Sequence, residues 1–435
     1  MTGTTPPPER PVGVPMLSSP IARRRFLALS GAGAGAIAAT AWIRPSWFST
    51  AGAASANSTS TAATTDHTLV YVFLRGAADG LSFVAPIGDA AYQDARPGVA
   101  IAEADALALD ARFGLHPAAP RLKAMFDAGT LALIPAAGSP ERNRSHFSMQ
   151  DAMDKGTPGD LSTRDGWLGR YLHTTAGASE ATLRTLGIGS SMAPSLRGGG
   201  AIAAPNLQSL ALTAAGSTAT SAQLRQSLGS MYDQFGDTAL RDQAMAGLAV
   251  IDQLAPIAQN AAPPADWPTG FGTAFWPIAK LLADGFPVEV ATLDLGGWDT
   301  HDAMGAATDT NGRMRKLVAN LDTALGAFFD HLGSRASQVT VVVVTEFGRR
   351  IALNGSGGTD HGRGMTMMVA GGGVRGGIKG RWPGLVDTDS GDVRVVNDYR
   401  TVLAEVLARR MRSVDLGTVF PGFDASPATR LGVMA

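Results

Sequence analysis

The sequence predicts an α/β fold: a three-layer sandwich with a mostly parallel central sheet, helices on both faces, and an insertion or cap. Apolar segments of strand length alternate with segments of helical periodicity through residues 67–435, which follow a flexible linker at 57–66. The run Val341–Val344 is apolar on both faces of a strand, which is typical of parallel strands covered by helices. The chain has 435 residues and 45% hydrophobic side chains, enough for a large core.

The first half of the domain supplies two strands and two helices in alternation. Residues 68–74 (TLVYVFL) are rich in β-branched and aromatic side chains, which favour a strand. A helix is expected at 120–128, where apolar residues recur on one face, and a strand at 130–136. The next helix is expected at 145–155, with a serine at its N-cap.

The second half resumes this alternation after a less regular segment. Residues 190–275 are rich in Ala, Ser, Thr, Gly and Pro, and we interpret them as a cap over the sheet, with helices within 221–254. The other expected elements are strands at 184–189, from 288, from 340, at 369–373 and at 378–382, and helices ending at 282, at 312–332 and at 399–411.

Residues 1–56 are expected to be an export signal rather than part of the fold. Three arginines precede the moderately apolar run 26–43, and residues 54–56 (ASA) have the small side chains of a cleavage site. The segment Arg23–Leu27 resembles the twin-arginine signal R-R-x-F-L, which implies the twin-arginine export machinery as a partner and a periplasmic, cell-envelope or extracellular location. An uncleaved membrane anchor is the alternative, disfavoured because the run is glycine-rich and barely long enough to span. No stable membrane span is expected after cleavage.

Composition excludes several classes of function. The net charge of −1, without a basic patch in the domain, argues against nucleic-acid binding. The absence of cysteine excludes iron–sulfur ligation by thiolates. No G-x-G-x-x-G motif follows the first strand, so a nucleotide-dependent oxidoreductase is also disfavoured.

Carboxylates and imidazoles follow several predicted strands, at the ends where ligands bind in open α/β sheets. Both groups are ligands for zinc or manganese, so we predict a site for one or two divalent ions. The candidate ligands are Asp79, Asp299, His301, Glu346, Asp360 and His361. Each alone is also explained by a helix cap, a solvent-exposed turn or a salt bridge, and the argument depends on their common position.

Ser145 is the candidate nucleophile, because it lies at an expected helix start next to two arginines. Helix N-terminal amides together with Arg142 and Arg144 would form an anion site and lower the pKa of a serine hydroxyl. Arg349 is a further candidate for holding phosphate oxygens. The alternative is that Ser145 only caps the helix.

Five motifs, spread over nearly the whole mature chain, resemble a family of bacterial exported proteins known as domain of unknown function 1501. They are LRGAADGLS, RSHF, LGGWDTH, TEFGR and GTDHGRG. Their order is similar to that of the alkaline phosphatase/sulfatase superfamily, which implies an alkaline-phosphatase-like fold. The resemblance implies Asp79 as the first ligand and Ser145 as the nucleophile. It also implies Asp299, His301 and His361 as first-metal ligands, and it sets Glu346 where the superfamily has an aspartate.

The sequence departs from the superfamily pattern at positions that bear on the metals. Phe347 stands where a second-metal histidine is expected, so His146 or Asp360 would have to replace it, and the Asp299–His301 spacing is short. Gly138 stands where a sulfatase needs Cys or Ser, which excludes a formylglycine nucleophile.

Together these features predict an exported metal-dependent hydrolase that acts on a phosphate or related ester, either a small molecule or an envelope polymer. The alternative is a catalytically degenerate scaffold that binds an envelope partner or a carbohydrate in the old cleft.

Overall fold

The computed structural model describes residues 66–160, 162–175, 184–210, 220–233, 238–411 and 415–435. The predicted export signal lies outside the described residues, as does the linker up to residue 65. One compact unit, 43–211 with 229–435, contains the sheet; the described residues of the other form most of α7 (Ser221–Asp233). No helix among the described residues has both the length and the apolarity needed to cross a membrane.

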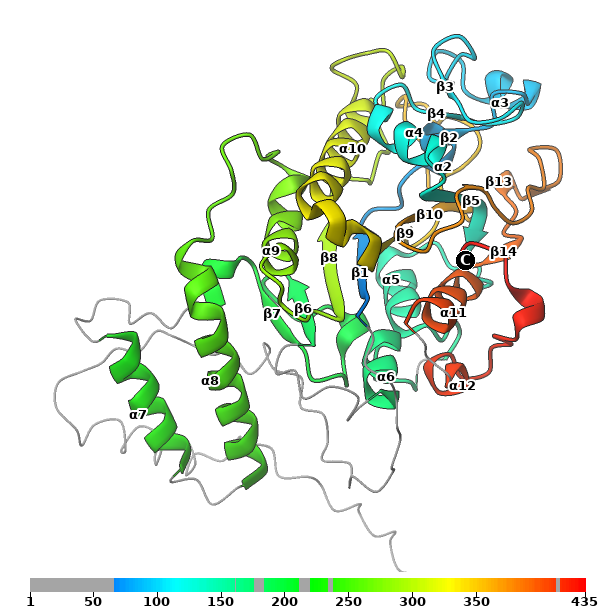
Figure 1. Cartoon of the computed structure of the whole chain (residues 1–435). Helices are drawn as coiled ribbons and strands as arrows, with labels where there is room; N and C mark the ends of the chain where they lie inside the picture. Colours follow the sequence, from blue (N-terminus) through cyan, green and yellow to red (C-terminus); the bar gives the residue numbers. More distant parts are fainter. Residues whose placement is uncertain (1–65, 161, 176–183, 211–219, 234–237, 412–414) are drawn as a thin grey trace, which may run out of the picture. The chain divides into compact units, whose positions relative to one another are not determined.

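In the described part of the chain, nine strands form a central sheet in the order β11-β5-β10-β9-β1-β8-β6-β7, with β14 paired to β5 (Figure 1). All their pairings are parallel except those of β10. The predicted mostly parallel sheet is therefore confirmed. The strands are β1 (Thr68–Leu74), β5 (Leu131–Gly138), β6 (Thr185–Ile188), β7 (Ile202–Ala204), β8 (Val290–Leu295), β9 (Val339–Thr345), β10 (Met365–Gly371), β11 (Gly377–Ile378) and β14 (Asn397–Asp398).

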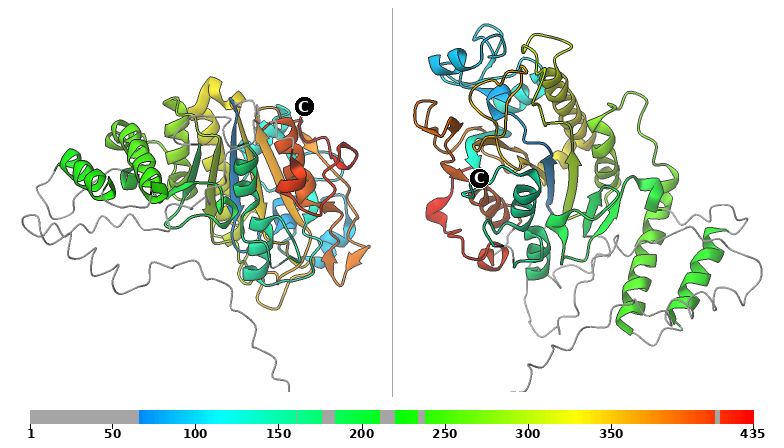
Figure 2. Two further views of the ribbon diagram at one scale, coloured as in Figure 1. Left: turned by 90° about the horizontal axis from the view of Figure 1, so that it is seen from below. Right: turned by 180° about the vertical axis from the view of Figure 1, so that it is seen from behind.

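Helices cover both faces of this sheet, because its central strands are apolar on both sides. In β1, Val70 and Val72 join one core cluster, while Tyr71 and Phe73 join the other. The first cluster includes side chains of α4 (Pro120–Asp127), α9 (Phe271–Ala283) and α10 (Arg313–Leu332). The second includes side chains of α5 (His146–Lys155), α6 (Trp167–Thr174), α11 (Tyr399–Arg409) and α12 (Leu416–Val419). The predicted three layers are confirmed (Figures 1 and 2).

The direction of β10 decides where the site forms. Since β10 runs antiparallel to β9 and β5, its first residue, Met365, lies opposite Ala137 near the carboxyl end of β5. The loop from Glu346 to Gly364 therefore leaves and re-enters the sheet at the same edge as the ends of β1, β5 and β8. Four polar connections meet at this edge, as the strand order predicts.

Some predicted elements differ from the structure in extent. The strand expected at 378–382 is only the two residues of β11, and the strand expected at 369–373 begins earlier, at Met365. Within the predicted cap, β7 extends the sheet, and α8 (Thr238–Gln259) contributes Val250 and Leu254 to the first core cluster. This segment is therefore partly integrated into the layers.

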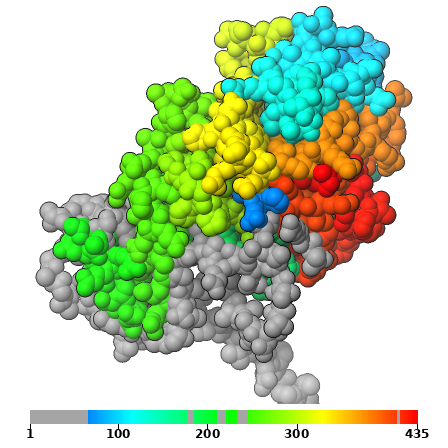
Figure 3. All heavy atoms as spheres, in the orientation of Figure 1, coloured from blue at the N-terminus to red at the C-terminus, as the bar shows by residue number. Residues whose placement is uncertain are grey.

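A third, smaller core lies beside the sheet and was not predicted. It joins Tyr92 and Ile101 to Ile351, Leu385 and Val393. In the space-filling view, residues of the 86–130 region (cyan) and of the 370–398 region (orange) lie side by side (Figure 3). The short elements here are α2 (Gly80–Phe83), α3 (Ala90–Ala95), β2 (Val84–Ala85), β3 (Leu107–Ala108), β4 (Gly114–Leu115), β12 (Thr388–Asp389) and β13 (Asp392–Val393). Short 3-10 helices are η2 (Pro194–Leu196), η3 (Leu207–Leu210), η4 (Gly333–Gln338) and η5 (Pro427–Thr429).

Candidate metal centre

Three side chains from three different connections meet at the carboxyl edge of the sheet. His146 begins α5 after β5, Asp299 follows β8, and His361 lies in the loop between β9 and β10. One nitrogen or oxygen from each lies within 4.8 Å of the others, a spacing that could hold a metal ion. Asp299 is 48% exposed, so a substrate can reach the cluster from solvent.

His301 contacts two of these three side chains. Its Nε2 lies 2.8 Å from Nε2 of His361 and 3.0 Å from Oδ1 of Asp299. Its other ring nitrogen, Nδ1, lies 3.0 Å from Oδ1 of Asp360, which also accepts a hydrogen bond from the Asn354 amide. Asp360 was predicted as a metal ligand; the structure places it behind His301, where it orients the ring toward the cluster.

His361 presents a nitrogen lone pair to the cluster. Its Nδ1 lies 2.8 Å from the backbone carbonyl of Arg144, and a carbonyl can only accept, so Nδ1 carries the proton. Burial lowers the pKa of His361, and the positive charge of Arg349 lowers it further, although the Arg144 carbonyl acts in the opposite direction. A neutral imidazole with a free Nε2 is the form that binds metal.

His146 shows the same arrangement more clearly. Its Nδ1 lies 2.7 Å from Oε1 of the fully buried Glu346, a carboxylate whose low pKa makes it an acceptor. Its Nε2 is buried and has no hydrogen-bond partner among the described residues. A buried ring nitrogen without a partner is costly in a folded protein, and an ion in the cluster would satisfy it. The residues present therefore fit a metal.

Glu346 was predicted as a ligand, but its oxygens are already occupied. Besides His146, Oε1 accepts from the backbone amide of Gly76 at 2.9 Å and from the Gln150 amide at 2.8 Å, and Oε2 accepts from Thr345. Burial alone would raise the pKa of Glu346, but the hydrogen bonds from Gln150 and its other donors outweigh burial and lower it. Glu346 thus positions His146 as an ionised partner.

Arg349 positions Asp299, and its guanidinium donors bond to protein groups. Its buried guanidinium donates to the carbonyls of Ala77 and Thr359 and to Oδ1 of Asp299. Burial alone would raise the pKa of Asp299, but the hydrogen bond and charge of Arg349 lower it. In the structure the donors of Arg349 face protein groups, and its binding of phosphate oxygens stays a prediction. Asp299 stays ionised and ready to ligate.

Asp79 does not belong to the cluster. Both of its oxygens accept from Nη1 of Arg96, at 3.0 and 2.9 Å, and both residues are buried. The carboxylate also caps α2 through Ser82 and accepts from the Thr359 hydroxyl. In the structure Asp79 is thus the partner of Arg96, and its predicted role as a metal ligand stays a prediction.

The residues predicted for catalysis lie next to the cluster in the chain. Ser145 occupies the N-cap position of α5, directly before His146, yet its side chain makes no capping hydrogen bond. Arg144 pairs with Asp392, and Arg142 pairs with Asp389 at 3.3 Å. Phe347, in the position of the missing histidine, packs its ring against those of His146 and His361.

The family described as a protein of unknown function (DUF1501) matches residues 130–412. The chain belongs to this family. The predicted assignment is thus confirmed, and the match contains the cluster but not Asp79. Among curated proteins, none matches the chain.

Several solved structures are similar to this DUF1501 chain at low identity. One is a protein in the alkaline phosphatase superfamily from Vibrio parahaemolyticus, with 11% identity and a TM-score of 0.33, covering 73% of this chain and 63% of that one. Another is the C-terminal periplasmic domain of EcEptC from Escherichia coli, in complex with Zn, with 9% identity, a TM-score of 0.35 and coverage of 70% and 73%. The alkaline phosphatase from the Antarctic bacterium TAB5 has 9% identity, a TM-score of 0.29 and coverage of 72% and 94%. The DUF1501 chain spans less than two thirds of the Vibrio protein, and such scores carry no information on activity.

Proposed function

We propose that this DUF1501 protein is an exported metal-dependent hydrolase that acts on a phosphate or related ester. The observation that carries the proposal is the buried, unpartnered Nε2 of His146, aimed at Asp299 from 3.6 Å while Glu346 holds the opposite ring nitrogen. A carboxylate–histidine pair of this kind orients metal-ligating imidazoles in proteins. Export rests on the twin-arginine resemblance of residues 23–27.

One ion is the number that the donors support. His146, Asp299 and His361 would hold it, with His301 as the fourth donor. The residues that a second ion would need, Asp79 and Glu346, are committed to Arg96 and His146. Three imidazoles with one carboxylate suit zinc or manganese. When bound, such an ion supplies a Lewis acid that polarises the ester oxygen.

The chain's own residues supply the nucleophile and its surroundings. Ser145 is the proposed nucleophile, because its hydroxyl makes no capping hydrogen bond and the next residue in the chain is a ligand. The backbone amides at the start of the ten-residue helix α5 favour negative charge near it. The half-exposed Asp299 leaves room for an ester to approach.

The alternative is a binding scaffold that no longer catalyses. Phe347 favours it, because this residue removes a ligand that two-metal hydrolysis would use. In that case the cluster would bind metal without turning over any ester. The two functions therefore share a metal site and differ in turnover.

The test is the metal content of residues 57–435, purified without chelator and after reconstitution with Zn²⁺ or Mn²⁺. We expect about one ion per chain, lost in Asp299→Ala/His361→Ala but kept in the matched control Asp302→Ala, whose side chain pairs with Arg313 instead. Phosphomonoester and phosphodiester screens then separate the hydrolase from the scaffold. A wild-type chain that takes up no metal would overturn both.

A further inference from the structure

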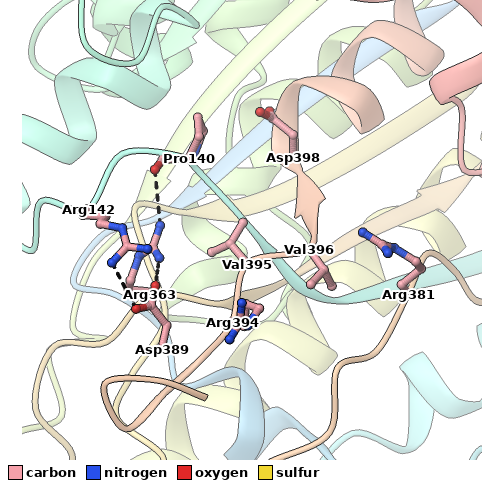
Figure 4. A pocket seen from close by; sticks show the side chains of 9 residues that line it. All are labelled: Pro140, Arg142, Arg363, Arg381, Asp389, Arg394, Val395, Val396 and Asp398. Atoms are coloured by element: carbon pink, nitrogen blue, oxygen red, sulfur yellow. Dashed lines mark hydrogen bonds and ion pairs between the residues drawn. The ribbon is translucent and has the colours of Figure 1, made fainter. Parts of the chain in front are cut away.

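We infer that a second site, an arginine-rich pocket beside the metal centre, binds a second anionic group of the same substrate. The inference rests on the proposed function for its substrate, but the pocket can be tested without turnover. Four of the nine side chains that line the pocket are arginines, two are aspartates, and the cavity has a volume of about 520 Å³ (Figure 4). A cavity of this size accepts a small ligand or one unit of a polymer.

The floor of the pocket is a buried guanidinium. Arg363 is 9% exposed; one of its Nη groups pairs with Asp389 and the other donates to the carbonyl of Pro140 at 3.3 Å. Its Nε is buried and has no hydrogen-bond partner among the described residues. Burial, followed by the like charge of Arg142, lowers the pKa of Arg363. An anion in the pocket would offset the charge repulsion between these arginines.

The rim adds positive charge that the protein neutralises only in part. Arg142 is 76% exposed and shares Asp389 with Arg363, so two guanidinium groups face one carboxylate. Arg381 is exposed, and its guanidinium has no ion pair or hydrogen bond in the described chain. Arg394 pairs with Asp387, which does not line the pocket. The other lining aspartate, Asp398, is held by Arg400.

The lining of the pocket therefore favours a ligand that carries negative charge next to an apolar group. Its lining carries four positive and two negative groups, a net charge of +2. Arginine forks bind phosphate, sulfate and carboxylate groups through paired hydrogen bonds. Figure 4 shows Arg142 and Arg363 facing Asp389 on one side, Arg381 on the other, and Val395 with Val396 between them. A ligand with an anionic group on a partly apolar body, such as a charged sugar, fits this lining.

The pocket and the metal centre share the segments that build them. Arg142 and His146 lie on one connection, and Arg363 follows His361 by two residues in another. The backbone carbonyl of Arg144 accepts from His361, while its guanidinium pairs with Asp392 in the hairpin that carries Asp389. These shared segments are the reason for assigning both sites to one substrate.

Binding of inorganic phosphate decides the inference independently of turnover. We use residues 57–435 with Asp299→Ala/His361→Ala and a chelator, so that the metal centre cannot contribute. Calorimetry is expected to show one phosphate site, which Arg381→Gln/Arg394→Gln weakens at least tenfold and which rising salt also weakens. The matched control, Arg112→Gln/Arg409→Gln, changes two arginines that do not line the pocket and is expected to bind like its parent.

Equal affinity in the pocket variant and the control, or no phosphate binding in the parent, would overturn the inference while leaving the metal result untouched. A chain that binds phosphate here but no metal would instead keep the pocket and refute the hydrolase. Competition with phosphate by sulfated dextran, with neutral dextran as the control, then tests whether the anionic group that binds belongs to a polymer or to a small molecule. Both substituted arginines are at the surface, so circular dichroism is expected to show an unchanged fold.

Discussion

Two carboxylates at the same edge of the sheet, Asp79 and Asp299, differ in their hydrogen-bond partners. Asp79 follows β1, and Asp299 follows β8, the strand that pairs with β1. Asp79 is buried and both of its oxygens accept from Arg96. Asp299 is half-exposed, accepts from Arg349 through one oxygen, and lies within reach of three imidazoles. Equivalent places in the fold thus hold one carboxylate whose oxygens are both occupied by protein partners and one that remains open to a ligand.

This difference shows that ligand atoms without a full set of protein partners, rather than strand ends alone, mark the site. In the Asp79 region every strong hydrogen-bonding group has a protein partner, and such a region stabilises the fold. In the metal centre, Glu346, Asp360 and the Arg144 carbonyl each hold an imidazole by its outer nitrogen. The inner nitrogen of His146 has no hydrogen-bond partner among the described residues, which costs stability unless a ligand binds. Three substitutions test this contrast, and a fourth tests a buried carboxylate outside both regions.

The largest expected effect is on stability, from Asp79→Ala. Removing the carboxylate leaves the buried charge of Arg96 without its partner, so we expect the free energy of unfolding to fall by about 3–5 kcal/mol. Metal content per folded chain is expected to stay the same. Urea denaturation and metal analysis measure the two effects, with the exposed Asp105→Ala as the control. A stable variant without metal would show that Asp79 is a ligand after all.

A buried group outside both regions gives the next effect. Asp154 is buried, its Oδ1 has no hydrogen-bond partner among the described residues, and its Oδ2 lies 3.0 Å from Arg75. Burial raises its pKa from 3.8 to about 7 despite that ion pair. The pKa of Arg75 is also raised: burial alone would lower it, but Asp154 and Asp294 outweigh burial. The balance differs because burial outweighs the single ion pair of Asp154, whereas Arg75 has two carboxylate partners, Asp154 and Asp294.

The pH dependence of stability follows from the direction of this shift. The pKa of Asp154 is higher in the folded than in the unfolded chain, so its contribution is complete below pH 4 and is lost as the pH rises to about 7. We expect the wild type to lose roughly 4 kcal/mol across this window relative to Asp154→Asn. Urea denaturation of both proteins at several pH values, with chelator present, measures the difference. Parallel curves would mean that Asp154 is ionised when folded.

Glu346→Gln has a smaller expected effect, on metal affinity. The amide oxygen can still accept from Gly76 or Gln150, but the negative charge that fixes and polarises His146 is lost. We expect the metal dissociation constant to rise about 10–100-fold while about one ion still binds at saturation. Competition with a chelator of known affinity measures it. Loss of all binding would make Glu346 a ligand, and an unchanged constant would remove its positioning role.

The sequence predicts the layers and most residues of the metal centre, but not which carboxylates are occupied by protein partners. Long apolar strands such as β1 and β9 were predicted because their pattern is local, whereas the two-residue strands β2, β3 and β4 carry no periodicity. Asp299, His301 and His361 were predicted, and the structure brings them together. The ion pair of Asp79 with Arg96 was not predicted, because only the folded chain distinguishes Arg96 as its partner.

His146 is a residue of the metal centre whose role the sequence did not predict. It was noted only as a replacement for the histidine absent at Phe347, because its role depends on Glu346, 200 residues away in the sequence. The signal that was available is a carboxylate, Glu346, at the end of the most apolar strand. In the structure this carboxylate reaches an imidazole on α5.

The smallest expected effect on stability comes from Ser145→Ala, and it decides to which region this serine belongs. A serine that caps a helix typically loses about 0.5–2 kcal/mol on replacement by alanine. Ser145 occupies the N-cap position of α5 without a side-chain hydrogen bond, so we expect a change within about 0.5 kcal/mol in urea denaturation. Any ester turnover should fall by several orders of magnitude while the metal remains bound. The control is Asp89→Ala, because this residue caps α3 through its side chain and should show the usual cost. A full capping cost at Ser145 with unchanged turnover would place it among the saturated, structural groups and leave the metal centre without a nucleophile.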